Sequence, residues 1–170
     1  MGTPVDRDDD YTAFATAVTP RLFRTALLMC GDWHLAEDLV QTTLAKLYVA
    51  WAKVERSDSS EAYARGTLTK TFLSHKRVRR NSETPTVDAG QLSDATSPAA
   101  ATADRLALFD ALRKLDVVDR AVVVLRYWED RSVSQTAAEV GLSEGAVRTR
   151  ASRALARLRL DLTDSSAAAS

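Results

Sequence analysis

The sequence predicts an all-α protein of two small helical domains joined by a flexible linker. Apolar residues recur at three- and four-residue intervals through most of the chain, without the alternating runs and Gly-rich turn pairs of β-hairpins. A polar stretch rich in Ser, Thr, Pro, Ala and Asp interrupts this pattern after residue 80. A chain of 170 residues is long enough for two modest cores. The expected division is a helical bundle at residues 10–80, a linker at 81–102 and a helix-turn-helix bundle at 103–162.

Two long helices should open the N-terminal domain. The first is expected from about residue 10 to residue 30, kinked or split by Pro20 and ended by Gly31. Asp32 then suits an N-cap, because its side chain can accept a hydrogen bond from a backbone N–H of the first turn. Apolar residues at helical spacing carry the second helix to about Val54, namely Ala36, Leu39, Val40, Leu44, Leu47 and Trp51.

A third helix, capped by Ser59 or Ser60, brings the first concentration of positive charge. The whole chain is neutral, with 23 basic and 23 acidic residues, yet residues 65–80 contain no acid. Phosphate contacts need local positive charge rather than a high overall pI, so a polyanionic partner is one explanation. A solvated basic helix face is the other. The basic residues are Arg65, Lys70, Lys76, Arg77, Arg79 and Arg80.

The C-terminal domain should begin with two further helices. Leu106, Phe109, Leu112 and Leu115 form the apolar stripe of the first. Asp116 suits an N-cap for the second, which is expected over residues 117–127. Its inward positions are Ala121, Val122 and Leu125.

The segment 132–160 has the spacing of a helix-turn-helix. Ser132 and Gln135 form a capping box, Gly141 supplies the turn, and Ser143 caps the second helix. Small and apolar residues at Ala137, Val140, Leu142 and Val147 would fix the crossing angle of the two helices. Two positions depart from the usual pattern, because Thr136 and Arg150 are polar where apolar residues are common.

The second helix of this motif carries five arginines and no acid between residues 145 and 160. A recognition helix reaches base edges and phosphates with its N-terminal half, and an Arg there can bind guanine bidentately. The alternative is two helices of a bundle with a solvated arginine face. The candidate DNA-binding residues are Arg148, Thr149, Ser152 and Arg153.

Other classes of function have little support in the sequence. The single cysteine, Cys30, cannot form an internal disulfide, and His34 and His75 lack ligand spacing or a nucleophile partner. We therefore expect no metal, no cofactor and no enzymatic activity. No apolar run approaches the length of a membrane span, and the acidic N-terminal residues are unlike a signal peptide. The expected location is the cytoplasm.

Two segments of the chain resemble bacterial RNA polymerase sigma factors of the extracytoplasmic-function (ECF) type, particularly the actinobacterial SigE-like group. The sequence GDWHLAEDLVQTTLAKLY at residues 31–48 is similar to region two of that family. The sequence LRYWEDRSVSQTAAEVGLSEGAVRTRASRALARLR at residues 125–159 is similar to region four. The polar linker between the two segments also fits the family.

The resemblance implies a role for each cluster and a set of partners. The AEDLVQ helix would bind core RNA polymerase through Glu37, Asp38 and Gln41. The third helix would capture single-stranded promoter DNA at the downstream element through Arg65, Lys70, Phe72, Lys76, Arg77, Arg79 and Arg80, although Phe72 also shares the core stripe. The four candidates of the helix-turn-helix would read the upstream element as duplex. An anti-sigma factor covering both promoter-binding domains is a further partner that the resemblance allows.

The residues alone leave two other classes open. A free-standing helix-turn-helix DNA-binding transcription regulator would bind duplex DNA tightly without polymerase, at a palindrome if it is a dimer. A purely protein-binding helical module would be insensitive to charge reversal at Arg148 and Arg153. A promoter-specificity subunit needs both polymerase binding and DNA binding.

Overall fold

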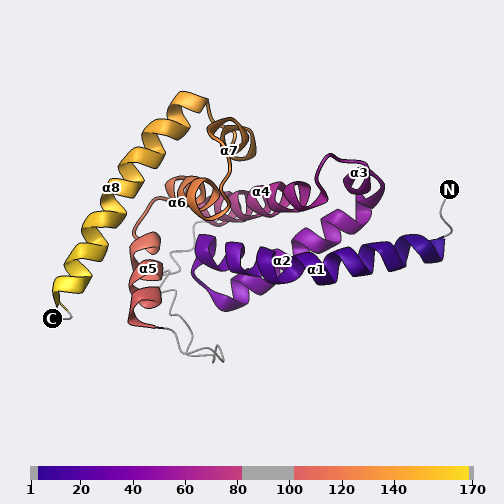
Figure 1. Cartoon of the computed structure of the whole chain (residues 1–170), viewed down its shortest axis with the longest axis horizontal. Coiled ribbons are helices and arrows are strands. Elements are labelled where there is room, and N and C mark those ends of the chain that lie inside the picture. The colour runs from indigo at the N-terminus through magenta and orange to yellow at the C-terminus, as the bar shows by residue number, and fades with distance from the viewer. Residues whose placement is uncertain (1–3, 82–101, 169–170) are drawn as a thin grey trace.

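The computed structural model describes residues 4–81 and 102–168, and these residues form helices without any strand (Figure 1). The all-α prediction is confirmed. The linker predicted at residues 81–102 falls almost wholly outside the described residues. In the N-terminal segment the helices are α1 (Pro4–Cys30), α2 (Trp33–Val49), α3 (Trp51–Glu55) and α4 (Ser60–Asn81). In the C-terminal segment they are α5 (Ala103–Arg113), α6 (Val117–Val123), the π-helical η1 (Val124–Trp128), α7 (Val133–Val140) and α8 (Glu144–Ala168).

Helix α1 is longer than the sequence pattern indicated. It begins at Pro4 rather than near residue 10, and Pro20 lies inside it without splitting it. Proline suits the first turn of a helix because the N–H it lacks would be unpaired there anyway. The first turns of α1 are also tied to α2, since the Tyr48 hydroxyl donates to Asp8 Oδ1 at 3.0 Å and the Tyr11 hydroxyl donates to the Leu44 carbonyl at 2.6 Å.

The second predicted helix is two helices in the structure. The chain departs from helical geometry at Ala50, with φ −93° and ψ 12°, and α3 continues in a new direction. Trp51, the first residue of α3, packs its ring against Tyr11 and Phe14 of α1, with ring centroids 5.4 and 5.0 Å apart. An aromatic cluster therefore stabilises the turn that the periodicity of the sequence did not reveal.

The helix caps follow the sequence closely. Asp32 accepts from the Leu35 N–H at 2.8 Å, Ser59 from the Ala62 N–H at 3.1 Å, and Asp116 from the Val118 N–H at 3.2 Å. In the capping box, Ser132 and Gln135 bond each other's backbone N–H groups at 3.0 Å. Each bond satisfies a donor that the first turn of a helix leaves unpaired.

Most buried residues of the two segments form one cluster. Leu22 and Met29 of α1 and Phe72 of α4 belong to it, together with Leu112 of α5 and Leu158 of α8. The predicted inward positions of α6 and η1 are buried, but Leu106 on the predicted stripe of α5 is 40% exposed and does not belong to this core. The C-terminal helices α5 and α8 lie side by side at one end of the molecule (Figure 1).

One buried arginine connects the segments through backbone carbonyls. Arg120 of α6 donates to the Met29 carbonyl, in the last turn of α1, at 2.9 Å, and to the Leu115 carbonyl at 3.2 Å. The last carbonyls of a helix have no partner within it and attract positive charge. The C-terminal end of α1 is thereby bonded to the start of the C-terminal core.

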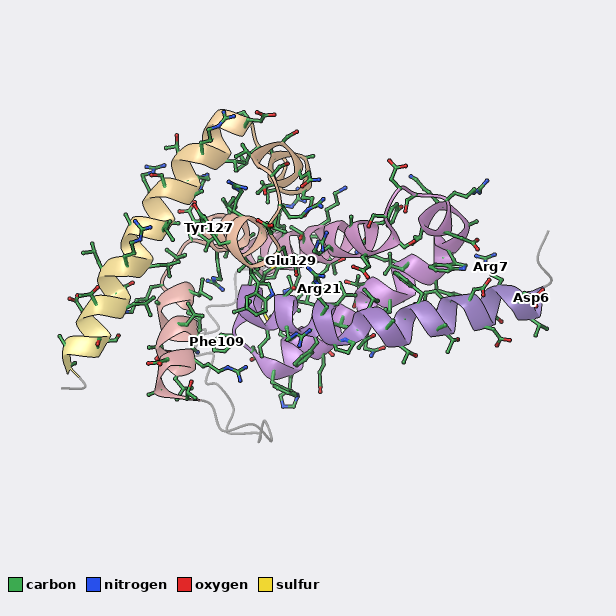
Figure 2. The ribbon with its side chains drawn as sticks, viewed as in Figure 1. Asp6, Arg7, Arg21, Phe109, Tyr127 and Glu129 are labelled. Carbon is green, nitrogen blue, oxygen red and sulfur yellow. The ribbon has the colours of Figure 1, made fainter. Side chains whose placement is uncertain are left out.

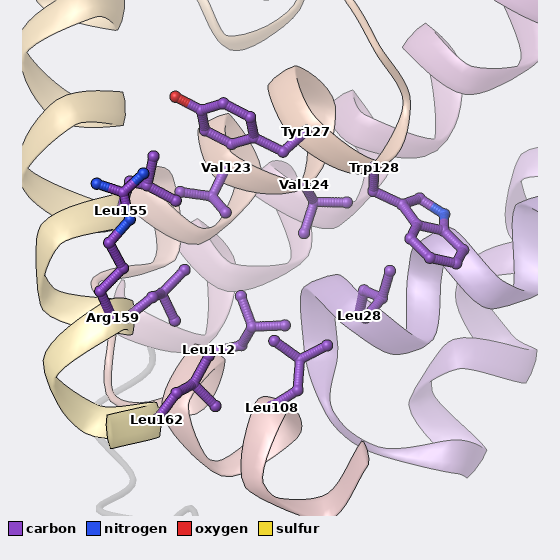
Figure 3. Close-up of a pocket in the computed structure, with 11 residues that line it drawn as sticks. Leu28, Leu108, Leu112, Val123, Val124, Tyr127, Trp128, Leu155, Arg159 and Leu162 are labelled. Atoms are coloured by element: carbon purple, nitrogen blue, oxygen red, sulfur yellow. The ribbon is translucent and has the colours of Figure 1, made fainter. Parts of the chain in front are cut away.

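An apolar groove of about 260 Å³ lies where α1 meets the C-terminal helices (Figure 3). Leu28 of α1, Leu112 of α5 and Leu162 of α8 contribute to its walls. Tyr127 and Trp128 of η1 stand on its rim, each about half exposed.

Candidate nucleic-acid interface

The turn between α7 and α8 has the geometry that a helix-turn-helix requires. Gly141 adopts a left-handed conformation with φ 73°, and its N–H donates to the Ala137 carbonyl at 2.9 Å. Ser143 then accepts from the Ala146 N–H at 3.1 Å and starts α8. Val147 and Ala151 of α8 pack with Ala137 in a small separate core. The crossing of the two helices is therefore fixed by buried side chains on both sides of the turn.

The N-terminal half of α8 presents a polar face to solvent. Its buried positions are Val147, Ala151, Ala154 and Leu158, which recur at helical spacing on the opposite side. Arg148 is paired with Glu144 at 3.3 Å, but both side chains are more than half exposed, so the pair is worth no more than about 1 kcal/mol. The four predicted DNA-binding residues, Arg148, Thr149, Ser152 and Arg153, are all exposed on this face.

Arg150 and Thr136, the two polar residues at usually apolar positions of the motif, lie in different environments. Arg150 turns away from the exposed face and pairs with Asp119 at 2.6 Å and Asp116 at 3.7 Å, near the start of α6. It holds α8 against α6 by charge where other motifs use an apolar contact. Thr136 is fully buried in α7, and its hydroxyl has no hydrogen-bond partner among the described residues. Arg150 is thus structural, and the neighbouring arginines of α8 are left for solvent.

The predicted single-strand residues on α4 divide between two faces. Lys70 and Arg77 are exposed on the same side as Ser74, and Lys76 is half-buried. Phe72 lies on the opposite side and is fully buried with Ala64 and Leu68. Its interpretation as a stacking platform is therefore wrong for this arrangement, because the ring belongs to the core and offers no face to a base. The side chains of Arg79 and Arg80 lie outside the described residues.

Arg65 is also withdrawn from solvent, with only 11% of its side chain exposed. Its Nη1 donates to Glu129 Oε2 at 3.1 Å, and Arg21 of α1 donates to the same oxygen at 3.1 Å. Glu129 comes from the turn after η1, in the C-terminal segment. Figure 2 shows Arg21 and Glu129 together at the junction of the two segments.

The three predicted polymerase-binding residues share one exposed face of α2. Glu37, Asp38 and Gln41 line a hollow of about 480 Å³ between α1 and α2. The aromatic rings of Phe23 and Trp33 contribute to this hollow and contact each other edge to face, with centroids 4.6 Å apart. Trp33 Nε1 also donates to Glu37 Oε1 at 2.9 Å, which orients that carboxylate. The face combines acidic and amide groups with an apolar floor.

Two elements of these surfaces were missed by sequence reasoning. Phe23 does not lie on the apolar stripe of α1, and Trp33 follows the N-cap Asp32 directly. An aromatic residue beside the AEDLVQ element with no assigned role was the sequence signal that could have indicated this hollow. The contact of Glu129 with Arg21 and Arg65 had no such signal, because it joins residues 108 and 64 positions apart.

Within residues 4–81 and 102–168, no helix is both long and apolar enough to cross a membrane. In the same residues, His, Cys, Asp and Glu side chains do not gather in threes that could hold a metal ion.

Comparison with known proteins gives matches over both segments. The family model for Sigma-70 region 2 matches residues 14–82, and that for Sigma-70, region 4 matches residues 105–158. The chain is 40% identical over 143 residues to the RNA polymerase sigma-E factor of Streptomyces coelicolor, covering 83% of this chain and 79% of that protein. It is 32% identical over 150 residues to the ECF RNA polymerase sigma factor SigL of Mycobacterium tuberculosis, covering 84% and 83%.

A solved structure agrees with these matches. The fold is similar to that in a co-crystal structure of the sigma factor RpoE in complex with the anti-sigma factor NepR from Bartonella quintana. The TM-score is 0.75 at 28% sequence identity, and the match covers 91% of this chain and 97% of that one. The chain therefore belongs to the sigma-70 family of RNA polymerase sigma factors. Within that family it is of the ECF type, and the interpretation as a free-standing regulator is set aside.

Proposed function

We propose that this protein is an alternative sigma factor that binds core RNA polymerase, recognises two promoter elements and helps to melt the downstream one. The observation that carries the proposal is the exposed, arginine-rich face on the second helix of a well-formed helix-turn-helix, in a chain of the ECF sigma family. The protein acts in the cytoplasm, where its polymerase and DNA are. It confers specificity and is not itself an enzyme.

Core polymerase binds the face formed by Glu37, Asp38 and Gln41. The two carboxylates and the amide accept hydrogen bonds from basic groups of a partner, and charge-assisted bonds of this kind are stronger than neutral ones. Phe23 and Trp33 supply apolar area beside them. The core behind α2 is unaffected by this contact, because Ala36, Leu39 and Val40 point inward.

The upstream promoter element is read as duplex by α8. Its N-terminal half enters the major groove, where Arg148 and Arg153 contact guanine edges or phosphates and Thr149 and Ser152 contact either bases or backbone. The Glu144 carboxylate beside Arg148 is exchanged for DNA at little cost, because the pair is exposed.

The downstream element is held as a single strand along the exposed face of α4. Lys70, Lys76 and Arg77 neutralise backbone phosphates, and Arg79 and Arg80 extend the same charge along the chain. Lys70 therefore contributes a cation on the exposed side of α4. An anti-sigma factor is a further candidate partner, since the similar RpoE structure is a complex with one.

Polymerase binding is tested by the double substitution Asp38→Arg with Gln41→Ala. Both side chains are exposed, so we expect the fold to be retained and affinity for bacterial core polymerase to fall at least about tenfold, through lost bonds and charge repulsion. Glu55→Arg, an equal charge change at an exposed site on α3, is the matched control. The affinity of each variant for core polymerase is measured by fluorescence anisotropy, and circular dichroism checks that each variant is folded. Equal affinity of the double variant and the control would contradict the proposed docking face.

A further inference from the structure

Glu129 is a carboxylate with no exposed side-chain surface, held by donors from the other segment of the chain. The guanidinium groups of Arg21 and Arg65 each donate to its Oε2 at 3.1 Å, and the hydroxyl of Thr25 donates to its Oε1. Arg21 and Thr25 lie one turn apart on α1, and Arg65 comes from α4. Three donors on two helices thus converge on one anion.

The backbone around Glu129 is shaped to deliver it to this place. The residue directly follows the π-helical η1, and its N–H donates to the Val124 carbonyl at 3.0 Å. Asp130 follows in a left-handed conformation with φ 52°, which L-residues other than Gly rarely adopt. The Arg131 N–H then donates back to the Leu125 carbonyl at 2.9 Å. Single π turns are frequent at functional sites, and this one turns the carboxylate toward α1 and α4.

The donor set is that of a phosphate site. Two guanidinium groups and a hydroxyl around one oxyanion are what proteins use to hold a phosphodiester, because arginine offers planar, permanently charged donors. Half of the Arg21 side chain remains exposed, and a hollow lined by Arg21, Arg24 and Trp128 opens beside it. An anion larger than a carboxylate has access from that side.

We propose that Arg21, Thr25 and Arg65 form a binding site for a backbone phosphate of promoter DNA, which Glu129 of the same chain occupies in the arrangement described here. The proposal rests on the proposed function and extends it, since it assigns Arg21 and Thr25 to the DNA surface of the N-terminal segment. Phosphate and Glu129 exclude each other at this site. DNA therefore gains the site only when the C-terminal segment moves away from α1 and α4.

Neighbouring contacts support this exclusion. α4 also contacts α6 and α7. Gly66, next to Arg65, faces α7, and a Cβ on it would be in van der Waals contact with Cγ of Glu139 at 3.9 Å. Glu139 is itself fixed by Arg131, with distances of 2.7 and 3.0 Å. The side of α4 that carries Arg65 is thus covered, while the face with Lys70 and Arg77 is open.

The first test is binding of a 20-residue oligothymidylate to the full chain without polymerase. Glu129→Gln removes the competing charge, so we expect affinity about tenfold higher than wild type and a salt dependence steeper by roughly 0.7, from one added phosphate contact. Adding Arg21→Gln to Glu129→Gln should remove most of the gain in affinity and reduce the extra slope. Arg105→Gln, the same charge change at an exposed site on α5, should leave the slope of Glu129→Gln intact in the same background. Equal effects of the two arginine substitutions would overturn the site.

The second test uses a disulfide to fix the contact between α4 and α7, and it leaves Glu129 unchanged. Gly66→Cys with Glu139→Cys places two cysteines at facing positions of the α4–α7 contact, since a Cβ on residue 66 would lie 3.9 Å from Cγ of Glu139. We expect the oxidised protein to bind the oligonucleotide several-fold more weakly than the same protein after reduction, with each single-cysteine variant insensitive to redox. Equal binding by oxidised and reduced protein would overturn the proposal.

These readouts are independent of polymerase. If the reduced double-cysteine protein supports promoter-specific transcription but disulfide formation leaves oligonucleotide binding unchanged, the phosphate site is wrong and the sigma-factor function stands. If binding responds to Glu129→Gln and to the disulfide as expected while no transcription is supported, the site stands and the proposed function fails.

Discussion

Cys30 ends α1 with its thiol buried, and the pKa of that thiol is raised to about 11, chiefly because burial disfavours the thiolate. The thiol also donates to the Asp32 carbonyl at 3.3 Å. A thiolate is the reactive form of cysteine, so burial lowers the reactivity of this residue in the folded protein. Because the Cys30 thiol is buried, it should not compete with two cysteines introduced at positions 66 and 139 for disulfide formation.

The same pKa shift gives stability a defined pH dependence. The folded state keeps the thiol proton up to about pH 11, whereas the unfolded chain loses it near 9.0. The stabilisation is complete below the unfolded pKa and is lost as pH rises through the folded pKa, with a slope of about 1.4 kcal/mol per pH unit between them. Urea unfolding between pH 8 and pH 11 should show this slope in wild type and lose it in Cys30→Ala. Parallel curves for the two proteins would contradict the assignment.

At the scale of elements, Gly→Ala substitutions near helix ends can distinguish the cost of backbone strain from the cost of steric crowding. Gly141 has φ 73°, and a Cβ added to it would meet no described atom within 4 Å, so Gly141→Ala should cost about 1 to 2 kcal/mol from the backbone alone. Gly31 has φ 68°, and its Cβ would lie 2.9 Å from Cδ of Arg113, so Gly31→Ala should cost more. Gly145, with open space and no positive φ, is the control, and Gly145→Ala should stabilise α8 by about 0.5 to 1 kcal/mol. Denaturant midpoints in any other order would contradict this account.

Local elements were the part of the fold that the sequence predicted well. The caps at Asp32, Ser59 and Asp116, the capping box and the left-handed Gly141 depend on neighbours within four residues, so their chemistry is visible in the sequence. The break at Ala50 was missed because it depends on the packing of Trp51 against α1.

At the scale of the whole molecule, two small helical domains joined by a linker were predicted, but the sequence did not show that most of their buried residues meet in one cluster. Periodicity identifies the apolar face of each helix but does not say which distant face covers it. In the same way, the sequence shows where charged residues cluster but not which distant residues pair with them. Arg65 was grouped with Lys70 and Arg77 because they are near in sequence, yet Glu129 removes Arg65 from solvent and leaves the other two exposed.

The shared core and the Glu129 contact suggest how the molecule is used. The recognition face of α8 is open in this arrangement, whereas the Arg65 side of α4 is covered by α7. On the proposed function, α8 and the Lys70 face of α4 can therefore contact DNA in this arrangement, whereas the Arg65 site cannot. On the proposed function, polymerase binding to α2 does not require the Glu129 contact to open, because Glu37, Asp38 and Gln41 are exposed.

The most direct test of the central claim is transcription in vitro from a fragmented bacterial genomic library, with core polymerase in the presence and absence of this protein. RNA 5′ ends are mapped in both reactions. The sigma-factor account predicts discrete start sites that occur only with the protein and share two upstream sequence elements, and it predicts their loss with Asp38→Arg and Gln41→Ala. The absence of protein-dependent starts, with folded protein and active core polymerase, would contradict it.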